Sequence, residues 1–442
     1  MSTNAAVPAG YSAASVRIRA RYPTLLLWFL VAGAALSGMS FDIGGGHVRI
    51  DQAASILLVV RLGAETLLGR KLYLDAAFFW LVGYLSITAL SSVWAPDSRN
   101  SLLQTLNLSS MAAIYLLLTN YLKSNDALGR FWQTFLVVGT VAITVGLLLF
   151  VAVLLGFAGE YMPFSIWTGY GAYGTMREPN IFGGFAALFL LLGIALIARP
   201  RSAVTTRARR WVLILLFVAG GGLIFSFTRA SWVGALSVLL PTLVSLRRRV
   251  RLKVVVPLLA AIAVAVAIAA SPLVPGDYLR YKVTNLVDFQ DGTGAGRLAI
   301  WSTALEETQQ RPWIGWGTYS FGDLHKEGTE ASQELPWIGN FAVTVLHDSG
   351  IIGSLFFGAF LVVTVRGGLR DAKRLWKHAP ETAVRLVGLC YGVVALLIAF
   401  LATTGFSFGY PWIALGLIGA YRRRARQILA VPGGAVIGDA SV

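Results

Sequence analysis

Long apolar runs separated by short polar gaps make up most of this chain. A helix needs about 20 mostly apolar residues to cross the roughly 30 Å hydrocarbon layer of a bilayer. Runs of that kind occur at residues 23–40, 51–68, 73–94, 102–122, 128–157, 179–198, 209–226, 231–246, 252–271, 341–365, 383–403 and 408–421. The pattern therefore predicts an all-α polytopic membrane protein with about 12 transmembrane helices.

The positive charges fall at every second gap between these runs. Of the 37 Lys and Arg, 28 lie at the two ends of the chain or in alternate gaps, whereas the acidic residues lean toward the other gaps. Lys and Arg are enriched in the cytoplasmic loops of membrane proteins. The asymmetry therefore predicts that both termini are cytoplasmic and that the sparsely charged gaps face outward.

Composition supports a membrane class. The chain is 56% hydrophobic and only 13% charged, which a soluble protein of 442 residues could not hide from water. The formal net charge of +16 suits the headgroups of anionic lipids, and no nucleic-acid-binding motif accompanies it. The one cysteine, Cys390, lies inside an apolar run, so we expect it to pack in the core.

These patterns divide the chain into five parts. We expect a disordered cytoplasmic tail at 1–20, nine transmembrane helices within 21–271, an outer loop at 272–340, three further transmembrane helices within 341–421, and a basic cytoplasmic tail at 422–442. The first run lacks a convincing cleavage site and is interpreted as a retained span rather than a signal peptide. No internal repeat is apparent, which gives no support to an inverted-repeat transporter.

The outer loop of 69 residues is long for a connection between packed helices, which favours a functional role. Its middle, from Arg297 to Gln310, is predicted to be helical and to end before Pro312. Leu298, Trp301 and Leu305 share one face at spacings of three and seven residues, so we expect that face to lie against the bundle.

Few charged residues lie outside the basic gaps, and three arginines among them are candidates for anion binding. Arg229 lies in SFTRASWVG, between two runs with no room for a loop, and Arg297 opens the predicted loop helix. Arg177 precedes a Pro-Asn pair that begins a run. A guanidinium group matches the geometry of phosphate oxygens. The alternatives are a snorkelling Arg229 and a solvated Arg297.

His347 lies about two turns, or about 10 Å, inside a predicted span, and its spacing of seven residues places it on the same face as Asn340. An ionisable side chain at that depth is a functional candidate, although a histidine bonded between helices is the alternative.

Asn180 is interpreted either as a helix cap or as a ligand of a sugar hydroxyl. We find no metal-binding or ATP-binding motif, and we expect no cofactor.

Four segments together resemble the O-antigen ligase/polymerase family of membrane glycosyltransferases. They are GTMREPNIFGGFAALFL, SFTRASWVG, GRLAIWSTALEETQQRPWIGWGTYSF and NFAVTVLHDSGIIG, which span about residues 165–365. Their order and spacing are similar to those of the family signatures. The family's closing element usually reads His-Asn, whereas this chain has Gly339-Asn340.

The resemblance implies a glycan donor linked to undecaprenyl pyrophosphate, used without metal on the periplasmic face of the bacterial inner membrane. It implies that Arg229 and Arg297 bind the pyrophosphate. The acceptor hydroxyl needs a base that can take up a proton near neutral pH, and an imidazole is such a base. His347 is therefore predicted to activate the acceptor hydroxyl for inverting transfer. The further candidates for substrate binding are Arg177, Asn180, Asn340, Trp301 and Trp316.

The acceptor separates the alternatives. We interpret the chain as an O-antigen ligase whose acceptor is the lipid A-core oligosaccharide. An O-antigen polymerase and a protein O-oligosaccharyltransferase would use the same donor. A lipid-linked glycan transporter is the alternative from another class, but transporters place their sites near the bilayer midplane, whereas these candidates lie near one face.

Overall fold

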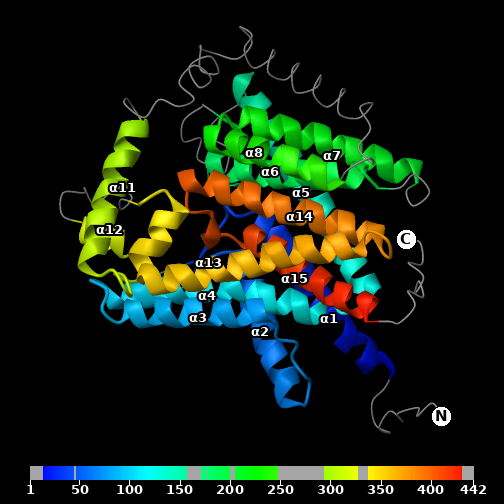
Figure 1. The fold of residues 1–442 in the computed structure, drawn as a ribbon, viewed down its shortest axis with the longest axis horizontal. Helices are drawn as coiled ribbons and strands as arrows, with labels where there is room; N and C mark the ends of the chain where they lie inside the picture. Colours follow the sequence, from blue (N-terminus) through cyan, green and yellow to red (C-terminus); the bar gives the residue numbers. More distant parts are fainter. Residues whose placement is uncertain are drawn as a thin grey trace.

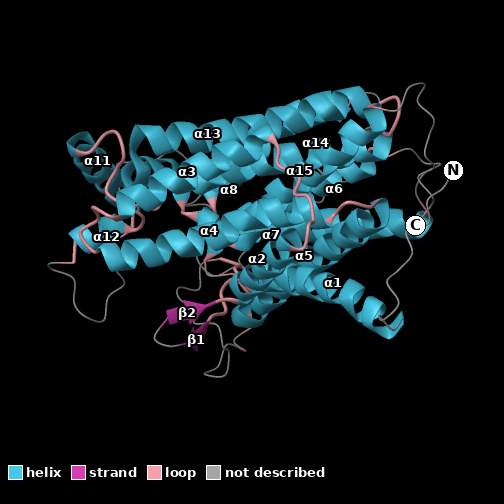
Figure 2. Ribbon diagram, turned by 90° about the horizontal axis from the view of Figure 1, so that it is seen from below, coloured by secondary structure: helices cyan, strands magenta, loops and turns pink. Residues whose placement is uncertain are grey.

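A computed structural model describes residues 13–43, 46–155, 157, 171–176, 178–199, 205–246, 293–326 and 337–430. Most of its long helices run in roughly the same direction, along the long axis of the molecule (Figure 1). The helices are α1 Ala13–Ala35, α2 Ile50–Leu67, α3 Ala76–Ser92, α4 Ser98–Tyr121, α5 Asn125–Leu154, α6 Pro179–Ile197, α7 Thr206–Phe225, α8 Arg229–Leu246, α11 Thr293–Gln310, α12 Ser320–Leu324, α13 Phe341–Leu375, α14 Pro380–Ala399 and α15 Gly409–Leu429, with 3-10 turns η2 Phe400–Ala402 and η3 Gly405–Ser407. The strands β1 Phe41–Ile43 and β2 Gly46–Val48 form a short antiparallel hairpin between α1 and α2 (Figure 2).

The prediction of an all-α polytopic membrane protein is confirmed. Within the described ranges, seven helices are long and apolar enough to cross a membrane, namely α4, α5, α6, α7, α8, α13 and α14 with its 3-10 extension. Shorter apolar helices cover Thr24–Ala35 and α3. Each predicted run coincides with a helix except 252–271, which lies outside the described residues.

Helical structure extends further at both ends than the sequence indicated. The expected disordered tail at 1–20 overlaps α1, which begins at Ala13, and the expected basic tail from residue 422 overlaps α15, which ends at Leu429. The last turns of α15 carry four arginines, and their cationic side chains are favoured near a helix C-terminus by its dipole.

Helix α6 forms the centre of the bundle, packed between α7, α8 and α14. Small residues make this packing possible because they let two helices approach closely. In lipid the hydrophobic effect does not hold helices together, so close contact between them must stabilise the bundle. A Cβ atom at Gly388 of α14 would lie 2.8 Å from the Cβ of Ala195, and one at Gly392 would lie 2.4 Å from a methyl group of Leu188. Cys390 is fully buried and packs beside Gly368 of α13, as the sequence predicted.

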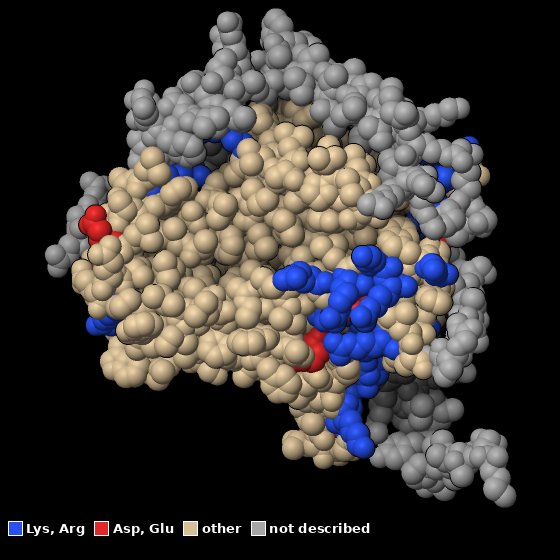
Figure 3. Space-filling model, in the orientation of Figure 1, with Lys and Arg blue, Asp and Glu red and all other residues tan. Residues whose placement is uncertain are grey.

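The two ends of the bundle differ in charge. Lys and Arg gather where α13 and α15 end (Figure 3), and the residues of this basic end include Arg370, Lys373, Arg374, Arg422, Arg423, Arg424 and Arg426. Helices α11 and α12 lie at the other end, beside the start of α13 (Figure 1). Exposed aromatic side chains occur at this second end, among them Trp94, Trp313, Tyr319 and Trp337. Tyr and Trp favour membrane interfaces, so these residues are suited to mark where the bundle leaves the bilayer.

Candidate active site

The first residues of α6 and α8 lie side by side. Ala172, just before α6, donates a backbone hydrogen bond of 2.7 Å to the carbonyl of Phe225 at the end of α7. A Cβ at Gly183 of α6 would lie 2.2 Å from Oγ1 of Thr228, so glycine is needed for this approach. Arg229 is the first residue of α8 and is half-buried. The tight turn predicted from SFTRASWVG therefore places Arg229 beside the start of α6.

Arg297 reaches the same place from α11. Burial lowers the pKa of Arg297, the positive charge of Arg229 lowers it further, and the negative charge of Glu178 acts in the opposite direction. Two guanidinium groups and one carboxylate are thus close enough to influence one another. The charges of Glu178 and Arg229 both act on Arg297, and we refer to Glu178, Arg229 and Arg297 as the charged cluster.

The geometry of α11 corrects one expectation. The helix begins at Thr293, so Arg297 lies one turn inside it rather than at its first residue. Leu298 and Leu305 are 43% and 42% exposed, whereas Ala304 is fully buried with Ile300 and Trp301 beside it. The face of α11 that packs on the bundle is therefore centred on Ala304. The two leucines at helical spacing therefore did not identify the packed face of α11. The small residue Ala304, which permits the helix to approach the bundle closely, marks that face.

Glu178 is the member of the charged cluster that the sequence did not single out. It is the residue at the N-cap of α6, yet its side chain makes no capping hydrogen bond to that helix. Instead it accepts a hydrogen bond from the hydroxyl of Thr403, which lies between α14 and α15. Its charge also acts on Tyr410 of α15. The sequence did contain a signal that could have identified Glu178. It is a carboxylate in one of the sparsely charged gaps, and it directly precedes a helix that begins with proline.

The two remaining candidates from this segment have different outcomes. Arg177 lies outside the described residues. Asn180 is the second residue of α6, so the interpretation of Asn180 as the helix cap is wrong, because the N-cap position belongs to Glu178. Asn180 lies in the first turn of α6 beside the charged cluster, and its role in binding a sugar hydroxyl stays a prediction.

A broken helix holds α11 in place. Gly350 interrupts α13 with φ +63° and ψ −168°, and the segment from Pro312 to Gly317 packs into the break. Trp316 and Gly317 donate backbone hydrogen bonds of 2.9 Å to the carbonyls of His347 and Asp348. In return, Ile351 and Ile352 donate to the carbonyls of Pro312 and Trp313 at 2.8 and 3.1 Å. The backbone groups freed by the break are thus satisfied, which a membrane protein requires.

Glycines make this insertion possible. Gly315 and Gly317 have φ of +75° and +96°, a region that L side chains rarely adopt. A Cβ at Gly315 would lie 2.6 Å from backbone atoms of His347, Asp348 and Gly350. Gly315 is therefore needed for packing against α13, and Gly317 for packing against Ala95 and Ser101 at the turn between α3 and α4.

His347 lies in this junction and not in the charged cluster. Its side chain is fully buried, with Nε2 2.9 Å from Oε2 of Glu307 and Nδ1 3.3 Å from Oδ1 of Asp348. The other oxygen of Glu307 lies 2.9 Å from Nε2 of His325. Glu307 follows Arg297 by ten residues on α11, which corresponds to a rise of about 15 Å. The imidazole of His347 would have to leave Glu307 before it could reach a substrate bound at Arg229 and Arg297. The role of His347 as a base therefore stays a prediction.

Three other candidates make defined structural contacts. Asn340 caps α13, where its Oδ1 accepts hydrogen bonds of 3.0 and 3.3 Å from the amides of Ala342 and Val343. The indole of Trp301 donates to the carbonyl of Ile338 at 2.9 Å, and the indole of Trp316 donates to the carbonyl of Glu307 at 2.8 Å. The Trp301 contact joins α11 to the segment before α13, and the Trp316 contact joins α11 to the segment that follows it. The role of all three residues in binding substrate stays a prediction.

The contact between Glu307 and His347 leads to a testable prediction. Glu307→Ala should lower the free energy of unfolding by about 1–3 kcal/mol, because it leaves a buried imidazole nitrogen without its partner. The measurement is the thermal unfolding midpoint of the detergent-purified protein. Glu306→Ala is the matched control, since Glu306 is the exposed neighbour on the same helix. An equal midpoint for both variants would show that the junction does not depend on this contact.

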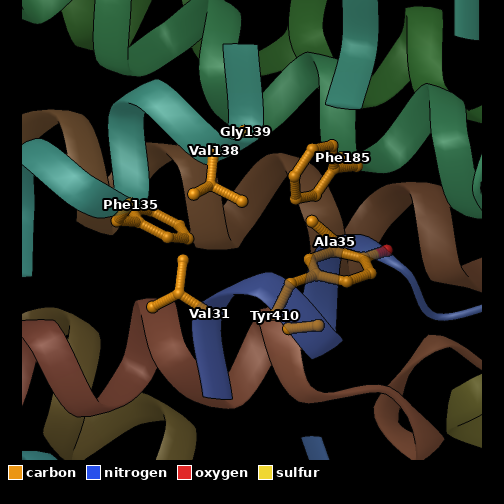
Figure 4. Close-up of a pocket in the computed structure, with 8 residues that line it drawn as sticks. Val31, Ala35, Phe135, Val138, Gly139, Phe185 and Tyr410 are labelled. Atoms are coloured by element: carbon orange, nitrogen blue, oxygen red, sulfur yellow. The ribbon is translucent and has the colours of Figure 1, made fainter. Parts of the chain in front are cut away.

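An apolar crevice elsewhere in the bundle does not resemble a glycan site. It lies between α1, α5, α6 and α15 (Figure 4) and has no room for a water molecule. Its lining residues are Val31, Ala34, Ala35, Phe135, Val138, Gly139, Phe185 and Tyr410. No charged side chain lines it, so it offers no partner to a phosphate. The charged cluster is the better candidate for an anionic substrate.

The chain resembles known proteins over the part that builds this site. Residues 211–358 match the model of the family described as O-antigen ligase. This segment is similar to the O-antigen ligase family, and we refer to it as the ligase-like segment. It contains most of α7, all of α8, α11 and α12, and the first half of α13, and therefore Arg229, Arg297 and His347. The resemblance inferred from the four motifs is confirmed.

A curated relative supports the same family. The chain is 28% identical to an O-antigen ligase of Pseudomonas aeruginosa over 257 residues, which are 57% of this chain and 56% of the relative. The match thus spans about half the length of the relative. Part of it must lie outside the ligase-like segment, because that segment is shorter than the aligned region.

Proposed function

We propose that this protein is an O-antigen ligase that transfers a glycan from undecaprenyl pyrophosphate to a hydroxyl of the lipid A-core oligosaccharide. The observation that carries the proposal is that the positive charge of Arg229 acts on Arg297, although the two arginines come from separate elements of the ligase-like segment. Bringing two like charges together costs free energy, which an anion recovers when it binds between them. A pyrophosphate is an anion of suitable charge, and guanidinium groups match its oxygens.

The same groups serve the chemical step. When the glycosidic bond to the carrier breaks, negative charge grows on the leaving pyrophosphate, and fixed cations in a partly dry site stabilise it. The first turns of α6 and α8 lie beside the cluster, and their dipoles also favour negative charge there. In-line attack by the acceptor hydroxyl inverts the anomeric carbon. A product of retained configuration would contradict this mechanism.

We propose that the site faces the periplasm across the bacterial inner membrane. The basic end of the bundle suits the cytoplasmic leaflet by the positive-inside rule. Helix α11, which carries Arg297, lies at the other end (Figure 1). A site at that end lets the polyprenyl tail stay in the bilayer while the pyrophosphate and the glycan reach the charged cluster.

The junction between α11 and α13 positions the site in this proposal. His347, Glu307 and Trp316 fix the C-terminal half of α11, and Arg297 projects from its other half. Removing these contacts would lower activity by loosening the helix that carries Arg297. His347 as the base is retained as the alternative, and it requires that the imidazole become accessible during the cycle.

The test is a transfer assay with the purified full chain and an undecaprenyl-pyrophosphate-linked glycan. One reaction contains lipid A-core as the acceptor, and the other contains only more of the lipid-linked glycan. We expect a product on lipid A-core and none from the donor alone. Longer lipid-linked glycan in the second reaction would instead establish the polymerase, and the absence of any transfer in both would overturn the proposal.

A further inference from the structure

Four cations on α13 share one face of that helix at the basic end of the bundle (Figure 3). They are Arg366, Arg370, Lys373 and Arg374, and all four are exposed. Their spacings of four, seven and eight residues from the first place them within an arc of about 100° around the helix. They extend over about 12 Å of its length. We refer to these four residues as the basic stripe.

The opposite face of the same segment is packed on the bundle. Gly368 and Asp371, which lie between members of the basic stripe in the sequence, are buried. A Cβ atom at Gly368 would lie 2.5 Å from Sγ of Cys390 on α14 and 3.0 Å from a methyl carbon of Ile418 on α15. The basic stripe therefore lies on the outer surface of the bundle, on the side of α13 that faces away from α14 and α15.

The more buried arginines at this end of the bundle have acidic partners. On α15, Nε of Arg422 lies 3.4 Å from Oδ2 of Asp371, and both side chains are 5% exposed. Arg199 and Arg385 both contact the carboxylate of Glu381, at 2.6 and 3.3 Å. In contrast, no residue of the basic stripe forms an ion pair or a side-chain hydrogen bond with another residue that the structure describes. The charge of the stripe is thus left for an anion that does not belong to the described chain.

The level of the stripe along the bundle favours a lipid as the source of that anion. Arg366 directly follows the apolar residues 351–365. Gly368 packs beside Cys390, which lies about 15 Å along α14 from its first residue, Pro380. The start of the stripe is therefore level with an apolar part of a helix that can cross the membrane. Lipid covers the outer surface at such a level, and long basic side chains can reach from there to the headgroups.

We propose that the basic stripe binds the headgroups of anionic glycerophospholipids in the leaflet at the basic end of the bundle, an inference that does not depend on the proposed function. Guanidinium groups match the oxygens of a phosphate, and the lysine adds a point charge. Four cations carry more charge than one phosphate neutralises, so the stripe takes more than one phosphate group.

Bound lipid would stabilise a helix on which much of the bundle depends. Helix α13 packs against α3, α11, α14 and α15. A ligand that binds the folded state and not the unfolded state raises the stability of the protein. Anionic lipid on the stripe therefore raises the unfolding midpoint, and salt weakens the effect because it screens exposed charges.

The experiment compares the triple variant Arg370→Gln/Lys373→Gln/Arg374→Gln with wild type, both as the full chain purified in detergent. The probe is phosphatidylglycerol, and phosphatidylcholine with the same acyl chains is the neutral lipid. Native mass spectrometry counts the lipids that stay bound, and the unfolding midpoint is followed during a lipid titration. We expect wild type to retain phosphatidylglycerol in preference and to gain stability from it. The apparent affinity of the variant for phosphatidylglycerol should fall about 10-fold to 100-fold, because three cations near the headgroups are lost.

A second triple variant, Arg207→Gln/Arg209→Gln/Arg210→Gln, is the matched control. It removes the same charge from the first turns of α7, which follows α6. The contact of Arg199 with Glu381 places the end of α6 beside the start of α14, so these arginines lie at the same end of the bundle. The control should keep the wild-type affinity for phosphatidylglycerol. Similar midpoints of both variants in phosphatidylcholine would show that both are folded.

Three results would overturn the inference. Equal losses of affinity in the two triple variants would show that net charge, and not the stripe, attracts the lipid. An unchanged lipid response in the stripe variant would leave the stripe to another anion, such as an acidic protein segment. A rise of the wild-type midpoint with inorganic phosphate as large as the rise with phosphatidylglycerol would identify a site for free anions rather than for lipid headgroups.

Discussion

Arg297→Ala is expected to lower the transfer rate about 10²-fold to 10³-fold, which corresponds to about 2.7–4 kcal/mol of transition-state stabilisation. Arg229→Ala should have an effect of the same size, because in the proposed mechanism both guanidinium groups stabilise the charge that develops on the leaving pyrophosphate. The two losses should not add, since the second arginine cannot hold the donor correctly once the first has gone. The measurement is the steady-state rate at saturating acceptor, with donor affinity determined in parallel.

Two further variants sharpen this prediction. Arg297→Lys keeps the charge but loses the planar fork, so it should recover only part of the rate. Arg99→Ala is the control, because Arg99 is an exposed arginine in the first turn of α4 that the charged cluster does not include. If both Arg229→Ala and Arg297→Ala bind the donor normally and transfer at the wild-type rate, the two arginines do not form the pyrophosphate site.

Gly350→Ala is expected to prevent the protein from folding stably. Its φ of +63° alone costs a side chain about 1–3 kcal/mol. The new Cβ would also lie 2.4 Å from the backbone C and O of Trp313 and 2.6 Å from the backbone N of Ile314. Backbone atoms cannot move aside as a flexible side chain does, so the segment from Pro312 to Gly317 would be expelled from the break in α13. The four backbone hydrogen bonds across the junction would be lost with it.

The measurement is the yield of monodisperse protein and its unfolding midpoint in detergent. Gly358→Ala is the matched control in the same helix, because nothing lies within 4 Å of the position where its Cβ would be built. That variant should be neutral or up to about 1 kcal/mol more stable, since alanine favours a helix. Equal yield and stability for the two variants would show that the junction tolerates a side chain and that the break in α13 does not depend on glycine.

The helices themselves could be predicted from the sequence with little help. In lipid every backbone donor and acceptor needs a partner within the protein, so a long apolar run has hardly any alternative to a helix. The runs at 179–198 and 231–246 therefore coincide with α6 and α8 within two residues. The charge asymmetry between gaps likewise appears as a basic end of the bundle (Figure 3).

The roles of single side chains were harder to predict. Helical spacing predicted that Asn340 and His347 share one face, but it gave no information about their partners. Asn340 lies at the N-cap of α13, before the helix begins, and accepts hydrogen bonds from the first amides of that helix, whereas His347 lies within the helix and contacts the carboxylate of Glu307 on α11. Spacing within one helix describes that helix alone, whereas a partner depends on how two helices are packed.

Sequence by itself determined the membrane class, the positions of the helices and, through four motifs, the similarity to the O-antigen ligase family. The tertiary structure alone decided that α13 is broken at Gly350, that α11 is joined to it through Glu307, and that Glu178 lies with Arg229 and Arg297. The physical reason is the range of the forces. Hydropathy and backbone hydrogen bonding act within a segment and can be read along the chain, whereas this site for charged groups forms from residues that are 51 to 119 positions apart.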